Sequence, residues 1–104
     1  MVVGRPVRDR HQGLVDLTWC LFLPARHAHD RMRRDGITVA WIERIITQPE
    51  LTMPDPDNPA LTLAWRRIPE LGGRFVRVVY YPNGTDLVIV TTFPDRGAPR
   101  RWRP

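Results

Sequence analysis

The apolar residues of this chain change their spacing at one point, and this change limits the folds that the chain can adopt. Between residues 25 and 49 they recur every three or four residues, and after Pro59 they alternate with polar residues. The first spacing indicates amphipathic helices and the second indicates half-buried strands. Residues 53–59, which contain three prolines, separate the two parts and favour a turn. Helices followed by strands predict an α+β domain.

Two short helices are predicted before the turn. The first covers residues 25–34 and follows a short strand in the second half of 14–23. Gly36 favours the left-handed conformation that ends a helix, and Thr38 is a good N-cap for the next one. The apolar stripe of this second helix consists of Val39, Ile42, Ile45 and Ile46. We therefore expect a helical hairpin with a very short connection.

Alternating residues predict three strands after Pro59, at 61–67, 75–81 and 87–93. Asn83-Gly84 between the last two is a strong signal for a β-hairpin. The last strand is the most apolar, so we expect it at the centre of the sheet, buried on both faces. The predicted fold is a helical hairpin packed on one face of an antiparallel sheet of three to five strands.

The two ends of the chain lack a periodic apolar pattern. The length of 104 residues fits a single domain. We expect that domain at residues 14–94, preceded by a flexible arm at 1–13 and followed by an arginine-rich tail at 95–104.

The charge of the chain comes from arginine alone. Sixteen arginines and no lysine give a net charge of +5, which fits a nucleic acid or an acidic protein as partner. A GC-rich genome that encodes every cation as arginine explains the missing lysine equally well. A single Cys20 excludes an internal disulfide. Without a long apolar run or a signal peptide, we expect no membrane contact and a cytoplasmic location.

The most specific motif of the chain runs from His27 to Ile37, HAHDRMRRDGI. It is similar to the HAxxRMxxRGI signature of a largely uncharacterised bacterial family. That family is related to BrnT and to RelE/ParE-like toxins, the RelE branch of the barnase–EndoU–colicin–RelE ribonuclease group. The similarity continues through 48–50, 76–79 and 88–94, so that it covers about residues 20–96.

The resemblance implies a RelE-like sheet with a basic cleft on the face opposite its helices. It also implies a toxin-like endoribonuclease that needs no metal and cleaves RNA by attack of the ribose 2′-OH on phosphorus. Such a reaction requires a base, an acid and a group that stabilises charge on the phosphate. His27 is the candidate base or acid, and Arg31 and Arg77 are candidates for the phosphate contact. Tyr80 and Thr91 are candidate hydroxyl donors.

Each of these candidates also has a structural interpretation. His27 is equally suited to bonding a backbone carbonyl near the start of a helix, and Arg31 to a solvated or ion-paired helix face. Arg77 interrupts an apolar strand, so it either faces a solvated cleft or pairs with an acid. The two hydroxyl residues are ordinary in strands.

Further RNA contacts are expected outside this centre. Asp35 stands where the related family has arginine, and Arg34 beside it can replace that contact. In the tail, Trp102 can stack on a base while arginines follow the phosphates; a disordered end and a strand that pairs with a partner are the alternatives. The candidate RNA-binding residues are Arg34, Arg67, Arg96, Arg100, Arg101 and Trp102.

The expected partners are RNA, free or on the ribosome, and an acidic antitoxin or immunity protein. The alternative function is a non-catalytic module that binds nucleic acid or protein on the same fold, because a fold does not determine an activity. No cofactor is expected. No metal site is expected either, since His27 and His29 point to different faces of a helix and Cys20 is a single thiol.

Overall fold

Two helices lie on one side of a mixed β-sheet in the computed structural model, which describes residues 3–4, 7–9, 13–15 and 21–98. The predicted α+β class is thus confirmed. The helices are α1 (Arg26–Asp35) and α2 (Val39–Thr47), and a 3-10 turn, η1, covers Pro69–Leu71. The strands are β1 (Val3–Gly4), β2 (Val7–Asp9), β3 (Gly13–Val15), β4 (Leu21–Pro24), β5 (Leu51–Pro54), β6 (Thr62–Ile68), β7 (Arg74–Asn83) and β8 (Asp86–Pro94).

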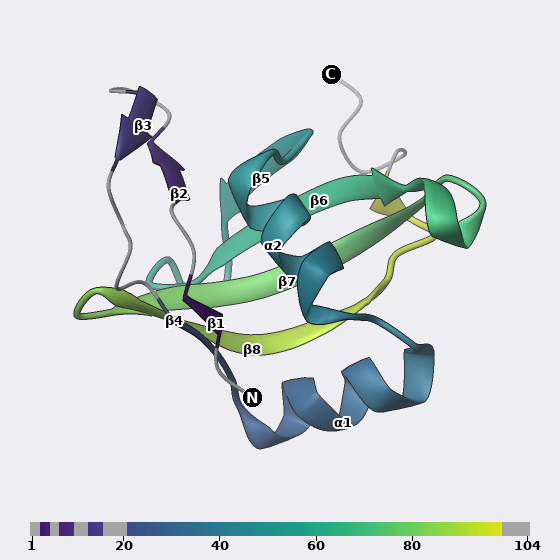
Figure 1. The fold of residues 1–104 in the computed structure, drawn as a ribbon, viewed down its shortest axis with the longest axis horizontal. Coiled ribbons are helices and arrows are strands. Elements are labelled where there is room, and N and C mark those ends of the chain that lie inside the picture. The colour runs from purple at the N-terminus through teal and green to yellow at the C-terminus, as the bar shows by residue number, and fades with distance from the viewer. Residues whose placement is uncertain (1–2, 5–6, 10–12, 16–20, 99–104) are drawn as a thin grey trace.

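The main sheet has the strand order β1-β4-β8-β7-β6-β5 (Figure 1). Its strands β5 to β8 form the predicted antiparallel meander. The expectation of an antiparallel-only sheet is wrong, however, because β4 runs parallel to β8. A parallel neighbour needs a long crossover connection, and here both helices and three strands lie between the two partners. Five strands have four or more residues, and β1 adds two more residues at the edge.

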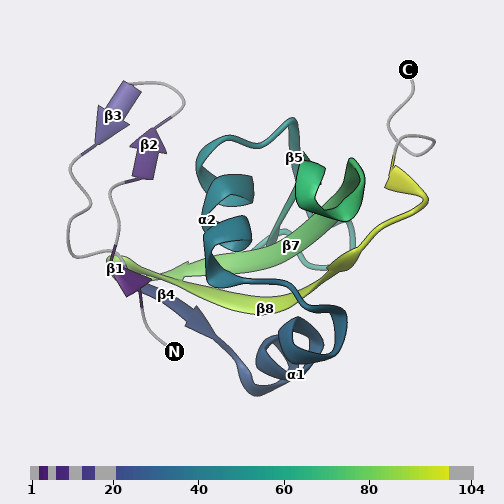
Figure 2. The same ribbon diagram turned by 45° about the vertical axis from the view of Figure 1, so that its right-hand side comes forward.

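Strand β8 has the central position that the sequence predicts, between β4 and β7. It is not buried on both faces, because only Ile89 and Thr92 are fully buried along its length. The helices cover one face only. Figure 2 shows α1 beside β8 and α2 over β7, which leaves the opposite face of the sheet without a helix.

Local signals set the ends of both helices. Gly36 has φ 71° and ends α1, and the Thr38 hydroxyl accepts a hydrogen bond from the Trp41 N–H at 3.2 Å at the start of α2. Both predicted caps are therefore confirmed. In the described part of the chain, no helix is long and apolar enough to cross a membrane.

Strand β5 was not predicted, because it includes Met53 and Pro54 from the segment interpreted as a turn. It pairs with β6 and forms one edge of the sheet. A proline is tolerated on an edge strand, where its missing N–H breaks no ladder on the outer side. The hairpin at Asn83-Gly84 is confirmed: Asn83 pairs with Asp86, and Gly84 has φ 65°.

Residues expected in the arm and in the tail also have regular contacts. Strand β1 pairs with β4, and β2 pairs with β3 as a separate two-stranded sheet. After β8, the Asp95 N–H donates to the Phe75 carbonyl at 2.8 Å, and Ala98 is fully buried. The predicted RNA contacts of Arg100, Arg101 and Trp102 lie outside the described residues.

Apolar side chains gather on both faces of the sheet. The larger cluster lies under the helices; its buried members are Ala28, Met32, Ile37, Ile42, Ile45, Ile46, Ala64, Ile68, Val76, Val78 and Ile89. A smaller cluster on the opposite face contains Leu63, Trp65, Val79 and Ala98. We call this second face the open face, because no described helix covers it.

A β-bulge interrupts the pairing of β7 with β8. Val79 pairs with Thr91 and Tyr80 pairs with Ile89, so Val90 is an extra residue on β8. Val90 packs against the cluster of the open face, whereas Ile89 belongs to the cluster under the helices. The residues beyond the bulge are therefore shifted by one position relative to a regular strand.

Ile45 tests the packing of α2 on the sheet, because its side chain has no exposed surface. Ile45→Ala should lower the free energy of unfolding by about 2–5 kcal/mol, and Ile45→Val by about 0.5–1.5 kcal/mol, since each removes buried methyl groups. Urea denaturation at neutral pH measures both changes. Equal losses for the two variants would contradict this packing.

An ion pair joins α2 to η1. The two terminal nitrogens of Arg44 donate to the two carboxylate oxygens of Glu70, both at 3.0 Å. This side-chain hydrogen bond is the largest cause that lowers the pKa of Glu70 from 4.5 to about 2. The carboxylate form is thus favoured in the folded protein.

Glu70→Gln should make stability less dependent on pH in the acid range. A lowered pKa in the folded state stabilises the protein above the pKa of the unfolded chain, and this contribution disappears as pH falls from 4.5 towards about 2. The difference in Tm between wild type and Glu70→Gln should therefore be small and positive at neutral pH and vanish near the lower value. Calorimetry across this range measures it. A difference independent of pH would overturn the assignment.

Candidate functional site

The open face carries a row of arginine and aromatic side chains. The Arg77 guanidinium of β7 lies over the Phe93 ring of β8, 4.5 Å from its centroid, and is 6.0 Å from the Trp65 ring of β6. Arg31 of α1 reaches the same Phe93 ring at 5.3 Å. Two cations from distant parts of the sequence therefore meet at one aromatic ring, in contacts that hold planar guanidinium groups in place.

The start of α1 explains how Arg31 reaches the sheet. The Ala25 N–H donates to the Ile89 carbonyl at 2.9 Å, so the helix begins against β8 and continues along it. Ala28 and Met32 point into the core, which leaves Arg31 at the border of the helix and the open face. Its Nε is buried and has no hydrogen-bond partner among the described residues.

His27 and Thr91 flank these arginines. His27 is exposed on α1, one helical turn before Arg31 and on the same side of the helix. Thr91 is half-buried and pairs with Val79, whose side chain belongs to the open face. The structure thus brings four of the predicted residues to one region: His27 and Arg31 from the helix, Arg77 and Thr91 from the sheet.

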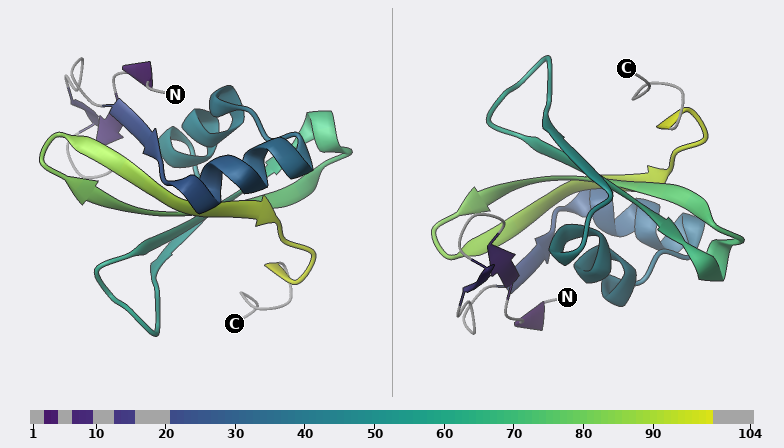
Figure 3. Two further views of the ribbon diagram at one scale, coloured as in Figure 1. Left: turned by 90° about the horizontal axis from the view of Figure 1, so that it is seen from below. Right: turned by 90° about the horizontal axis from the view of Figure 1, so that it is seen from above.

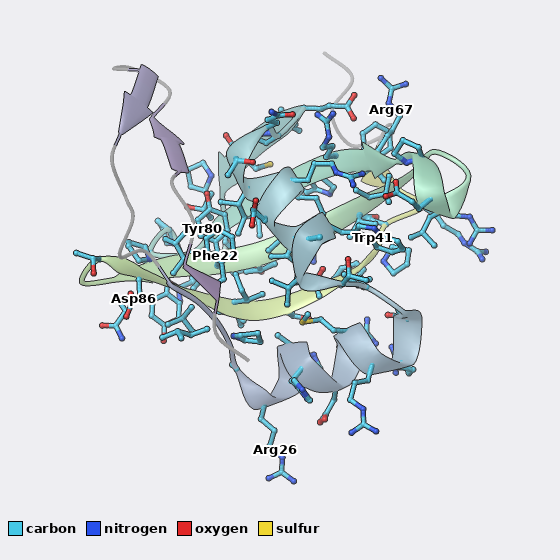
Figure 4. The ribbon with its side chains drawn as sticks, in the orientation of Figure 1. Phe22, Arg26, Trp41, Arg67, Tyr80 and Asp86 are labelled. Carbon is cyan, nitrogen blue, oxygen red and sulfur yellow. The ribbon has the colours of Figure 1, made fainter. Side chains whose placement is uncertain are left out.

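Tyr80 is separated from this group. Its side chain, labelled in Figure 4, packs against the cluster under the helices, so it lies on the other face from Arg77. Alternation along β7 explains this, because Val76, Val78 and Tyr80 share one face. The predicted role of Tyr80 as a hydroxyl donor beside Arg77 has no geometric support.

Two of the predicted RNA-binding arginines are paired with acids. Arg67 is exposed at the far end of β6 (Figure 4) and lies over the Phe75 ring at 5.6 Å. Its guanidinium donates to Glu50 at 2.7 Å, and this hydrogen bond is the largest cause that lowers the pKa of Glu50. The Nε atom of Arg34 lies 3.6 Å from a carboxylate oxygen of Asp35. Both cations can still approach RNA, but each carries a neighbouring negative charge.

A hydrogen bond to Asp95 holds the Trp65 side chain in place. The indole N–H of Trp65 donates to an Asp95 carboxylate oxygen at 2.9 Å, and both residues are buried. The other Asp95 oxygen accepts from the Gly97 N–H at 3.1 Å, which turns the chain after β8 towards the open face. Trp65 is therefore a rigid wall next to Arg77.

Among the described residues, two hollows lie at the open face. One has a volume of about 440 Å³ and is lined by Met53, Asp55, Pro56, Asp57, Leu63, Trp65 and Arg77. Its outer wall is the β5–β6 loop, which projects on the side opposite the helices (Figure 3). The other, about 350 Å³, is lined by Gly73, Arg74, Phe75, Pro94, Asp95 and Arg96. Arg96, a predicted RNA contact, is exposed there.

Sequence interpretation missed Phe93, Trp65 and Asp95 as site residues. The sequence shows that Leu63 and Trp65 recur two residues apart and so share a face, but a pattern of period two does not show which face is open. The described residues contain no group of three or more His, Cys, Asp or Glu side chains that could hold a metal ion.

Fold and site define a small α+β domain with an arginine- and aromatic-rich sheet face. The chain belongs to the family DUF4258, described as a domain of unknown function, whose model matches residues 25–94. This match spans every element from α1 to β8. No curated protein and no solved structure matches the chain.

Asp95→Ala should lower the free energy of unfolding by about 1–3 kcal/mol, because it leaves the buried Trp65 N–H without this acceptor. Asp95→Asn should lower the free energy of unfolding by a smaller amount, since its amide oxygen can accept the same hydrogen bond. Urea denaturation compares the two variants. If Asp95→Ala were as stable as wild type, the hydrogen bond would not hold Trp65.

Proposed function

We propose that this protein is a toxin-like endoribonuclease with a RelE-like arrangement, and that the open face is its RNA-binding face. The observation that carries the proposal is the meeting of Arg31 and Arg77 at the Phe93 ring, one helical turn from the exposed His27. This geometry joins two cations suited to phosphate with a side chain suited to proton transfer. The similarity of residues 27–37 to the toxin-related signature supports it.

Arg31 and Arg77 hold the phosphate in this mechanism. Their guanidinium groups donate to its non-bridging oxygens, and they stabilise the extra negative charge that develops on phosphorus. Phe93 keeps both groups in position, so little rearrangement is needed when RNA binds.

His27 moves the proton. The neutral imidazole accepts the proton of the ribose 2′-OH while that oxygen forms its bond to phosphorus. The bond from phosphorus to the 5′ oxygen breaks, and the 5′ oxygen leaves with a proton returned by the imidazolium. The products are a 2′,3′-cyclic phosphate and a 5′-hydroxyl. The Thr91 hydroxyl lies on the same face and is available to donate to the phosphate.

The net charge of +5 supports polyanionic and acidic partners. Within this proposal the substrate is RNA, free or on the ribosome, in the cytoplasm, and an acidic antitoxin or immunity protein blocks the open face. Arg96 at the second hollow is a further RNA contact.

A non-catalytic RNA-binding module is the second candidate. The row of Arg31, Phe93, Arg77 and Trp65 favours it, because arginines and rings in alternation bind single-stranded nucleic acid without any proton-transfer group. The two functions differ in one residue: only cleavage requires His27.

His27→Ala should reduce RNA cleavage by roughly 10²–10⁴-fold, the usual contribution of a general acid–base group, and leave RNA affinity nearly unchanged. Arg77→Ala should weaken both. Cleavage is measured on labelled single-stranded RNA with and without ribosomes, and products are tested for the cyclic phosphate. Affinity is measured on the same sequence with 2′-deoxyribose. Inducible expression in a bacterium, scoring growth and total RNA, gives the parallel result in cells.

Matched controls come from the same helix. His29→Ala and Arg26→Ala remove a histidine and an arginine from α1 outside the row, and Arg26 points away from the sheet (Figure 4). Both should behave as wild type. Intact RNA in every assay together with normal growth would refute the nuclease. RNA binding without cleavage, unaffected by His27→Ala, would establish the binding module instead.

A further inference from the structure

The hollow of about 440 Å³ beside Arg77 is built from two walls of different chemistry. Its inner wall is the open face of β6 and β7, with Leu63, Trp65 and Arg77. Its outer wall is the β5–β6 loop, with Met53, Pro56 and two aspartates. Such a volume is of the size that small planar ligands occupy in proteins.

The hollow offers apolar surface at its mouth, above a floor of packed side chains. Trp65 is nearly fully buried and is held by Asp95, and Met53 is 39% exposed at the mouth. Among the described residues, Met53 is the one large apolar side chain that is exposed. The flexible Met53 side chain is well suited to pack against an aromatic ring that enters above this buried floor.

The two aspartates at the outer wall have different roles. An Asp55 carboxylate oxygen accepts the backbone N–H groups of Asp57 at 2.8 Å and of Asn58 at 3.4 Å, which closes the turn of the loop. Asp55 is therefore a positioning residue. Asp57 is exposed and lines the hollow, and its carboxylate makes no hydrogen bond to another described residue. It presents two acceptors and no donor to a bound ligand.

From this arrangement we infer that the hollow binds one nucleobase of the RNA, next to the phosphate held by Arg77, and that Asp57 selects a base with an exocyclic amino group. The inference rests on the proposed function, since it names the substrate preference of the same face. A carboxylate accepts a hydrogen bond from the amino group of cytosine but meets a carbonyl oxygen at the same position of uracil. Cytosine is thus preferred over uracil, and the preference depends on Asp57.

The probes are fluorescein-labelled hexamers of 2′-O-methyl cytidine and of 2′-O-methyl uridine, which the nuclease reaction cannot cleave. Fluorescence anisotropy gives the Kd of each. Wild type should bind the cytidine hexamer about ten- to a hundredfold more tightly, the size expected for one hydrogen bond to a charged group. Asp57→Asn should bring the two Kd values within about twofold, because an amide donates and accepts equally.

Asp30→Asn is the matched control, since it removes an equal charge from an exposed position on α1, away from the hollow. It should keep the cytidine preference of wild type. The ratio of the two Kd values is compared, so a general gain of RNA affinity on losing a negative charge does not affect the result.

The outcomes separate this inference from the proposed function. Equal binding of both hexamers by wild type, or a preference that survives Asp57→Asn, overturns the inference and leaves RNA binding by the open face intact. Loss of the preference in Asp30→Asn overturns it as well. If wild type binds neither hexamer, the proposed RNA-binding face itself is refuted, and the base site with it.

Discussion

The parallel pairing of β4 with β8 is the constraint on which the site depends. Because of this pairing, β4 ends beside Ile89. The Ala25 N–H donates to the Ile89 carbonyl, so that α1 begins at the same point. The helix then packs along β8, with Ala28 and Met32 turned into the core. Arg31 is carried to the Phe93 ring as a result. Without this pairing, the two arginines that meet at Phe93 would belong to unrelated parts of the surface.

The features that the sequence predicted correctly depend on neighbouring residues. Gly36 ends α1 by its own backbone conformation, and Thr38 caps α2 by a hydrogen bond within the next turn. The hairpin at Gly84 is determined by four consecutive residues. The parallel partner of β8 and the edge strand β5 depend on contacts between distant segments, and no local pattern specifies them. Pro54 in particular suggested a turn, because its tolerance depends on β5 having an outer side with no partner.

The same division applies to the candidate site. Helical spacing alone put His27 and Arg31 on one side of α1, and the structure keeps them there. The rings that position the cations, Phe93 and Trp65, could not be assigned, because alternation gives two faces without saying which one a helix covers. Tyr80 was placed with Arg77 although their odd separation along one strand already predicts opposite faces, which the structure shows.

The extra residue in β8 determines which way the end of that strand faces. In a regular strand, positions separated by an even number share a side, so Phe93 would share a side with Leu87 and Ile89 beneath the helices. Val90 inverts this parity, and odd-numbered positions beyond it turn outward. The outward position of Phe93 therefore depends on the bulge, which places Val90 and Thr91 on the same face. The same residues paired without the bulge would keep their core pattern up to Ile89 and would direct Phe93 inward.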